Sequence, residues 1–291
     1  MYWDNIKSGF CASGRALLAS SVFLSPLGGQ TVTISGFVDG SIAIPTTSPI
    51  NPRFSLDVAE IDLEKQIDEG ISLRVDVDIL IDSAELEQAY VSFWGISFGK
   101  FNAPIGFEMI DAPDMYQFSH SLVFDYALPL NLTGISYSRD FTQDIQFIGY
   151  VVNSDDIGPN LGDNPILGGR LGYKGIAGVE AGLSAIFKGD GENIIDFDAT
   201  ITRMEKVTIG LEVNQGGYGP GELGYLLMVN WTPGRFGVTF RQDQLGKAGT
   251  TTISPSFSIA EGALILFEYR AGTDIDLEPL SQAALEMTFT F

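Results

Sequence analysis

The chain is poor in the residues on which most catalytic and metal-binding chemistry depends. It has one cysteine, Cys11, and one histidine, His120, in 291 residues. A disulfide within the chain and a zinc site of several Cys and His ligands are therefore excluded. A Ser-His-acid hydrolase would need His120 as its base, but Ser119 and Ser121 adjoin it in a predicted extended segment, where neighbouring side chains point to opposite faces. We expect no enzyme activity, no metal and no cofactor.

Long apolar runs and positive charges are also lacking. No window has the roughly 18 consecutive apolar residues that a membrane-spanning helix requires. The chain has 16 Lys and Arg against 37 Asp and Glu, a net charge of −21, and we expect no nucleic-acid partner. Its mean hydropathy is nevertheless +0.16, with 20 Phe and 10 Tyr, although a soluble protein this acidic is normally less apolar. Because only helices and closed barrels span membranes, a membrane protein of this composition would have to be a β-barrel.

Apolar residues recur at every second position almost throughout the chain. Residues 71–81 place Ile, Leu or Val at each odd position, and Arg or Asp at positions 74, 76 and 78. This period is that of a β-strand with one apolar face. Counting such runs predicts about 16 strands, good to about two. They are expected at residues 31–44, 52–65, 70–81, 84–94, 96–102, 132–140, 143–153, 165–174, 177–188, 193–203, 206–215, 223–232, 235–244, 249–260, 262–271 and 281–291.

The connections between these runs alternate between short turns and longer polar loops. A barrel with tight periplasmic turns and longer outer loops has this alternation. The connection after residue 244 is expected to be long, and the one after residue 81 is a short exception. A soluble β-sandwich is the alternative, but it does not explain why outward aromatic residues cluster at the short-turn end. We predict an all-β fold, a transmembrane antiparallel up-and-down β-barrel of about 16 strands. The clustered aromatic residues are Phe93, Tyr137, Tyr173, Trp231 and Phe291.

The two ends of the chain carry signals of export and membrane insertion. Lys7 and Arg15 precede the apolar run ALLASSVFL, and the helix-breaking SPLGG follows, which is the order of a secretory signal peptide. We predict a leader over residues 1–29 and a barrel over residues 30–291; a frayed amphipathic tail is the alternative. The C-terminal run resembles the insertion signal of outer-membrane barrels at Met287, Phe289 and Phe291. That resemblance implies the bacterial outer membrane, periplasmic termini and the barrel-assembly machinery as a partner.

One connection, residues 99–134, is much longer than the others. Pro104, Pro113 and Pro129 disfavour continuing the sheet, and the carboxylates of this connection would be unfavourable on a buried sheet face. It follows the fifth strand and is therefore the third outer loop, which in general porins folds into the lumen. We predict that three of its acids lie at or beside the narrowest part of the lumen, with a wall arginine as counter-charge. These residues are Glu108, Asp111 and Asp114, with Arg74 on the wall.

This connection also resembles a known outer-membrane family, the one called putative β-barrel porin-2. The family has a similar succession of Gly-Lys, Pro-x-Gly-aromatic-Glu, Pro-Asp, Ser-basic-Ser and Ala-x-Pro. The sequence departs from that pattern at His120, where Arg is expected, and at Leu132, where His is common. The resemblance implies a porin and names no solute. The matching positions are Gly99, Lys100, Pro104, Gly106, Phe107, Glu108, Pro113, Asp114, Ser119, Ser121, Ala127, Pro129 and Gly134.

The inward phase of the predicted strands carries more acids than bases. Rings of Asp and Glu in a pore favour cations. We therefore predict passive diffusion of small hydrophilic solutes or ions, with a preference for cations, in contact with outer-membrane lipids. A substrate-selective channel and a non-conducting structural or adhesive barrel are the alternatives, and a homo-oligomer stays open. The predicted lumen residues are Asp39, Asp76, Asp78, Glu180, Asp196, Asp198, Glu212, Asp243, Glu268 and Glu286, with the bases Arg74, Arg170, Lys188, Arg241 and Arg270.

Overall fold

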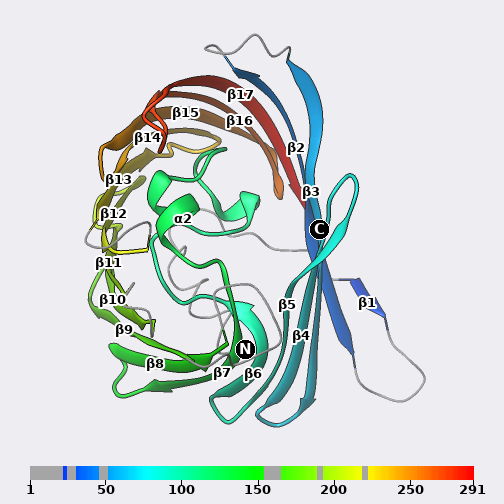
Figure 1. The fold of residues 1–291 in the computed structure, drawn as a ribbon. Helices are drawn as coiled ribbons and strands as arrows, with labels where there is room; N and C mark the ends of the chain where they lie inside the picture. Colours follow the sequence, from blue (N-terminus) through cyan, green and yellow to red (C-terminus); the bar gives the residue numbers. More distant parts are fainter. Residues whose placement is uncertain (1–21, 25–30, 46–51, 154–164, 189–192, 218–221) are drawn as a thin grey trace.

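Sixteen antiparallel strands, β2 to β17, form one closed barrel (Figure 1). The computed structural model describes residues 22–24, 31–45, 52–153, 165–188, 193–217 and 222–291. Each strand pairs with its neighbours in sequence, and β17 closes the barrel on β2. The strands are β2 (Val32–Pro45), β3 (Arg53–Asp68), β4 (Ile71–Ile79), β5 (Ala84–Phe93), β6 (Ile96–Asn102), β7 (Asn131–Asp140), β8 (Ile145–Val152), β9 (Ile166–Ile176), β10 (Val179–Phe187), β11 (Ile194–Ile201), β12 (Val207–Gln215), β13 (Leu223–Trp231), β14 (Phe236–Leu245), β15 (Ala248–Ala260), β16 (Ala263–Thr273) and β17 (Pro279–Thr290).

A further strand, β1 (Val22–Leu24), lies within the predicted leader. It pairs with residues 32–34 of β2, next to the stretch of β2 that pairs with β17. The rest of the predicted leader, residues 1–21 and 25–29, is outside the described residues. Cleavage near residue 29, and with it the division into leader and barrel, stays a prediction.

The two faces of the wall alternate as the sequence predicts. On β11, Ile195 and Phe197 are 52% and 45% exposed, whereas Asp196 and Asp198 are 0% and 2% exposed. Large apolar side chains therefore point outward, and charged and polar ones point into the barrel. This is the arrangement expected when the outer face contacts lipid and the inner face contacts water.

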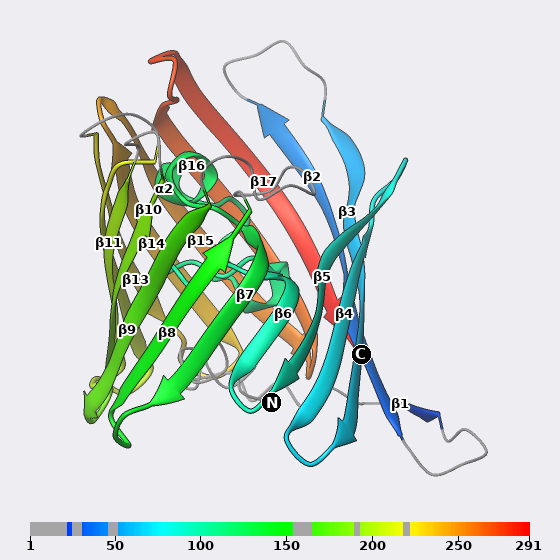
Figure 2. The same cartoon turned by 60° about the horizontal axis from the view of Figure 1, so that its bottom comes forward.

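Short turns gather at one end of the barrel, where the chain also ends (Figure 2). Two-residue turns join β5 to β6, β9 to β10 and β15 to β16. Outward aromatic side chains gather at this end and are between 39% and 46% exposed: Tyr137, Tyr173, Trp231 and Phe291. At the opposite end, the β14–β15 connection is only Gly246 and Lys247, so the prediction of a long loop there is wrong. The positive φ of 58° at Gly246 permits this tight turn.

The connection between β6 and β7, residues 103–130, lies inside the barrel, and we call it the inner loop (Figures 1 and 2). Its base is closed by the backbone N–H of Ala103, which donates to the oxygen of Leu130 at 2.8 Å. It contains a 3-10 turn, η1 (Ala112–Asp114), and a short helix, α2 (Leu122–Ala127). Across the described residues, no helix is long and apolar enough to cross a membrane.

Part of the inner wall is apolar, and the inner loop packs against it. Residues of β5 to β11, together with Ala103 at the start of the loop, form one buried cluster, and Ile105 and Leu128 of the loop pack on it. Two further residues of α2, Leu122 and Val123, pack with Leu245 of β14 in a second cluster. The inner loop thus has its own hydrophobic core inside the lumen, so burial as well as charge holds it in place.

Candidate functional site

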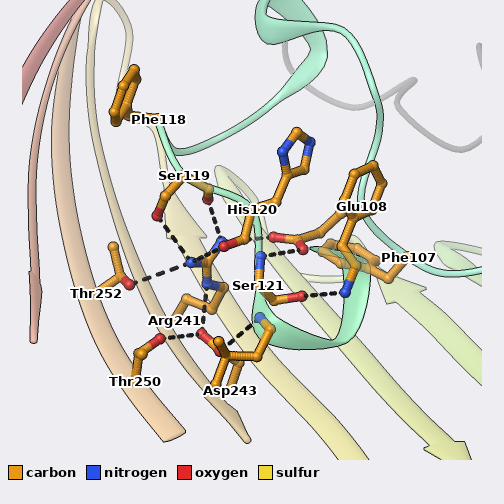
Figure 3. A network of polar contacts seen from close by, with 12 residues as sticks. Phe107, Glu108, Phe118, Ser119, His120, Ser121, Arg241, Asp243, Thr250 and Thr252 are labelled. Carbon is orange, nitrogen blue, oxygen red and sulfur yellow. Dashed lines mark hydrogen bonds and ion pairs between the residues drawn. The ribbon is translucent and has the colours of Figure 1, made fainter. Parts of the chain in front are cut away.

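Arg241 on β14 is the centre of the contacts that hold the inner loop to the wall (Figure 3). Its buried guanidinium donates from Nη1 to Glu108 Oε1 at 2.8 Å and to the backbone oxygen of Ser119 at 2.6 Å. Nη2 donates to the backbone oxygen of His120 at 3.0 Å, and Nε donates to Asp243 Oδ1 at 3.0 Å. The five donors of a planar guanidinium suit such multiple contacts. One wall residue therefore binds the loop at two separate places.

Glu108 is an anchor of the inner loop. Its side chain is 8% exposed, and Oε2 accepts the backbone N–H of Ser121 at 2.8 Å. Burial alone would raise the pKa of Glu108, but Arg241, with smaller contributions from His120 and Ser121, holds the pKa below its ordinary 4.5. The carboxylate is thus charged at neutral pH and neutralised by Arg241.

The start of α2 is fixed by two further acceptors. The Ser121 hydroxyl caps the helix by accepting the backbone N–H of Phe124 at 3.2 Å, and Asp243 Oδ2 accepts the backbone N–H of Leu122 at 3.1 Å. The ring of His120 stacks on that of Phe124 with centroids 3.9 Å apart. Acceptors at a helix start satisfy N–H groups that have no partner within the helix. The wall acid and the cap therefore set where α2 begins.

Two other wall carboxylates accept backbone N–H groups of the inner loop. Glu268 Oε2 accepts from Phe118 at 3.0 Å and from Ser119 at 3.1 Å. Glu212 Oε2 accepts from Phe107 at 3.0 Å. Several predicted lumen acids thus serve as acceptors that hold the loop, which the sequence did not indicate.

Two arginines on the wall form pairs within the wall itself. Arg170 on β9 binds Asp198 on β11 through two contacts, with Nη1 at 2.5 Å and Nη2 at 2.7 Å. Arg74, predicted as the counter-charge of the loop acids, donates from Nε to Asp76 at 2.7 Å and lies 3.6 Å from Asp62. On the loop, the carboxylate of Glu108 instead pairs with Arg241. Glu108 therefore does not pair with Arg74, the predicted counter-charge.

Asp111 of the inner loop approaches acids on the opposite wall. One carboxylate oxygen each from Asp111, Glu60 of β3 and Glu87 of β5 lie within 4.8 Å of one another. Glu60 also forms a second such group with Asp62 and Asp76. Negative charge is therefore concentrated where the inner loop faces β3 to β5.

The structure places the other predicted residues as follows. Asp114 lies half-buried in η1, and Arg270 Nε donates to the hydroxyl of Thr250 at 3.1 Å. Met287, Phe289 and Phe291, predicted as the insertion signal, are exposed on the outer face. The residues buried or half-buried on the inner face are Asp39, Asp76, Asp78, Glu180, Lys188 and Glu286.

Glu60 and Glu87 are wall acids that the sequence prediction missed. Glu60 is 3% exposed and Glu87 is 6% exposed. The register shifts at Asp39/Gly40 between β2 and β3, and at Asp76/Val77 between β4 and β5. A bulge reverses the inward phase on one side of it, and strict alternation then assigns the wrong face. In the sequence, the apolar positions change there from even (Val58) to odd (Ile61 and Leu63), and this change of phase was the available signal for Glu60.

Comparison with known proteins places the chain in a family. None of the curated proteins matches it. Among solved structures, it is similar to the outer membrane channel DcaP of Acinetobacter baumannii, with a TM-score of 0.70 and 10% identity over 92% of this chain and 99% of that chain. It is also similar to a triple mutant of Rhodopseudomonas blastica porin, with a TM-score of 0.66 and 13% identity over 89% and 100% of the two chains. These likenesses show the fold. The model of one family, described as "Putative beta-barrel porin-2, OmpL-like", matches residues 31–215, and the chain belongs to that family.

Proposed function

We propose that this outer-membrane channel allows passive diffusion of small hydrophilic solutes and ions and prefers cations. The observation that carries the proposal is the approach of Asp111 to Glu60 and Glu87, because it puts three carboxylates where the inner loop meets the opposite wall. A narrow aqueous passage strengthens the field of such a group relative to bulk water. Cations would gather there and anions would be repelled.

The charge balance of the lumen supports this selectivity. Arg241 is bound to Glu108 and Asp243, and Arg170 is bound to Asp198. On the opposite wall, Arg74 is shared between two acids. Acids there outnumber bases, and the residues concerned are Asp39, Glu60, Asp62, Asp76, Asp78, Glu87 and Glu286.

We propose that Glu108, Asp111 and Asp114 have different roles in the constriction. Glu108 holds the inner loop through Arg241, and Asp111 contributes charge to the passage. Asp114 lies three residues further on, in η1, which contacts β17. The short-turn end, where the chain ends, would face the periplasm, with the longer loops outside. The barrel-assembly machinery would recognise the apolar C-terminal strand.

Planar-bilayer recording tests the function directly. With a potassium chloride gradient across the bilayer, we expect single openings and a reversal potential of the sign given by cation flow, which falls in magnitude at high salt as screening increases. A reversal potential near zero or of the opposite sign would reject the cation preference. Absence of conductance from correctly folded barrels would favour a structural or adhesive barrel, and saturation of current by one solute would favour a substrate-selective channel.

A further inference from the structure

Three polar residues face one another on β11 and β12 under the root of the inner loop. Asp196 is the direct cross-strand partner of Asn214, and Glu212 is the partner of Asp198 in the same ladder. Asp196 and Asn214 are 0% exposed, and Glu212 is 1% exposed. Directly opposed residues on one face have Cβ atoms about 5 Å apart, so these side chains share one site.

Five polar atoms of this site have no hydrogen-bond partner of ordinary geometry among the described residues. Among the described residues, neither carboxylate oxygen of Asp196 has a hydrogen-bond partner, and the same holds for Glu212 Oε1 and for both amide atoms of Asn214. Asp196 makes only looser polar contacts, with the carboxyl group of Glu212 and with the backbone of Gly106. Buried carboxylates without donors are strongly unfavourable unless a cation or a proton compensates them.

The surrounding charges do not compensate the two acids. The charged groups that act on Asp196 and Glu212 are Arg170, Asp198 and Glu108. Arg170 is bound to Asp198, and Glu108 is bound to Arg241, so each of these pairs is neutral. When both are ionised, Asp196 and Glu212 carry two negative charges that these neighbours do not balance, in a site enclosed by protein.

We propose that Asp196, Glu212 and Asn214 bind a divalent cation of the calcium class at the root of the inner loop. The site offers two oxygens from Asp196, one from Glu212 and one from the amide of Asn214, all hard oxygen ligands. Calcium accepts irregular sets of oxygens, including carboxylates and amide carbonyls, and completes its shell with water. Magnesium requires near-octahedral geometry and is expected to bind more weakly.

The bound cation would fix the inner loop where it leaves the wall. Glu212 Oε2 accepts the backbone N–H of Phe107, so the same carboxylate reaches both the loop and the site. Gly106 has φ of 83°, and a Cβ there would lie 3.5 Å from Glu212 Oε1 and 2.5 Å from Leu128. The loop root is therefore pressed against Glu212, and neutralising Glu212 would affect the loop directly.

Calcium binding to the refolded barrel in neutral detergent tests the proposal. After removal of calcium with a chelator, equilibrium dialysis against radioactive calcium should count one equivalent more for the wild type than for Asp196→Asn or for Asn214→Leu. Asp144→Asn changes an exposed acid in the β7–β8 turn and serves as the matched control, which should keep the wild-type stoichiometry. Equal stoichiometry in all four proteins would reject the site. Dialysis needs no conducting pore, so this result is independent of the proposed transport function.

A second measurement uses the wild type alone and decides the question if the variants fail to assemble. Crystals of the barrel soaked in terbium, a calcium substitute, should give an anomalous peak between Asp196 and Asn214. A peak confined to the Glu60, Glu87 and Asp111 group, or the absence of any peak on β11 and β12, would mean that the acid pair holds a proton instead. Calcium should also slow proteolysis of the inner loop relative to chelator, and no difference would contradict the proposed role.

Discussion

Arg241 and Glu108 are 133 positions apart in the sequence, yet their side chains form a buried ion pair at 2.8 Å inside the barrel. The pair joins the wall of the barrel to the inner loop. Because both charges are removed from water, their attraction is offset by the loss of hydration. Removing one partner has a large effect on stability, because it leaves the other charge buried and unpaired. Its main effect is to specify where the loop lies.

The substitution Arg241→Met should release the inner loop from the barrel wall. The substitution leaves Glu108 charged and unpaired and removes the donors to Ser119 and His120. Breaking a buried pair on one side typically costs about 3–5 kcal/mol. We expect faster proteolysis within the loop and a larger, noisier single-channel conductance.

Two variants complete this experiment. Arg241→Met combined with Glu108→Gln removes the unpaired charge and should recover part of the lost stability, which a double-mutant cycle measures. Arg235→Met, in the exposed β13–β14 turn, is the control and should leave proteolysis unchanged. If Arg241→Met protects the loop as well as the wild type does, the pair does not anchor it.

The anchor should weaken in acid. The pKa of Glu108 is lower in the folded protein than its ordinary 4.5, so its stabilising contribution is fully present above about pH 4.5 and is lost as the pH falls through the folded pKa. We expect the difference in unfolding free energy between the wild type and Glu108→Gln to shrink with that fall. Urea unfolding at a series of pH values measures it. A difference that grows as the pH falls would contradict the ion-pair assignment.

The two faces of the wall should respond differently to a positive charge. Phe197 lies near the middle of β11 and faces outward, and Phe197→Arg should destabilise the barrel by about 2–4 kcal/mol in lipid. Ser41 faces inward on β2 opposite Glu286, so Ser41→Arg should cost far less. Unfolding in lipid vesicles, followed by tryptophan fluorescence, compares them. Equal costs would mean that the assignment of outward and inward faces is wrong.

The strands could be predicted because successive side chains along each strand face lipid and water in turn. That contrast imposes a strict period of two, as on β12, where the partly exposed Leu211 and exposed Val213 alternate with the buried Glu212 and Asn214. All sixteen predicted strands occur, with each end within three residues of the prediction. The long connection was predictable too, because its prolines interrupt the sheet.

The arrangement inside the lumen was less accessible to sequence analysis. Which wall arginine meets Glu108 depends on where the loop lies. The inward phase has four arginines that were equally good candidates by type: Arg74, Arg170, Arg241 and Arg270. Bulges moved Glu60 and Glu87 onto the inner face, and only near Glu60 did a change of phase in the apolar pattern mark the shift. Contacts between residues distant in sequence and single-residue shifts of register both depend on the assembled barrel.

Cation preference should depend on Asp111 more than on any other acid of the inner loop. Asp111 approaches Glu60 and Glu87, whereas the charge of Glu108 is neutralised by Arg241. Asp111→Asn preserves side-chain size and removes one negative charge from the passage, so the cation-over-anion permeability ratio should fall. The fall should be greatest at low salt, because the screening length shortens from about 30 Å at 0.01 M to about 3 Å at 1 M.

Reversal potentials in salt gradients measure the ratio, with Asp144→Asn, on an exposed turn, as the control. A ratio that Asp111→Asn leaves unchanged at low salt, in a barrel whose inner loop is still protected from protease, would place the path of the ions away from Asp111.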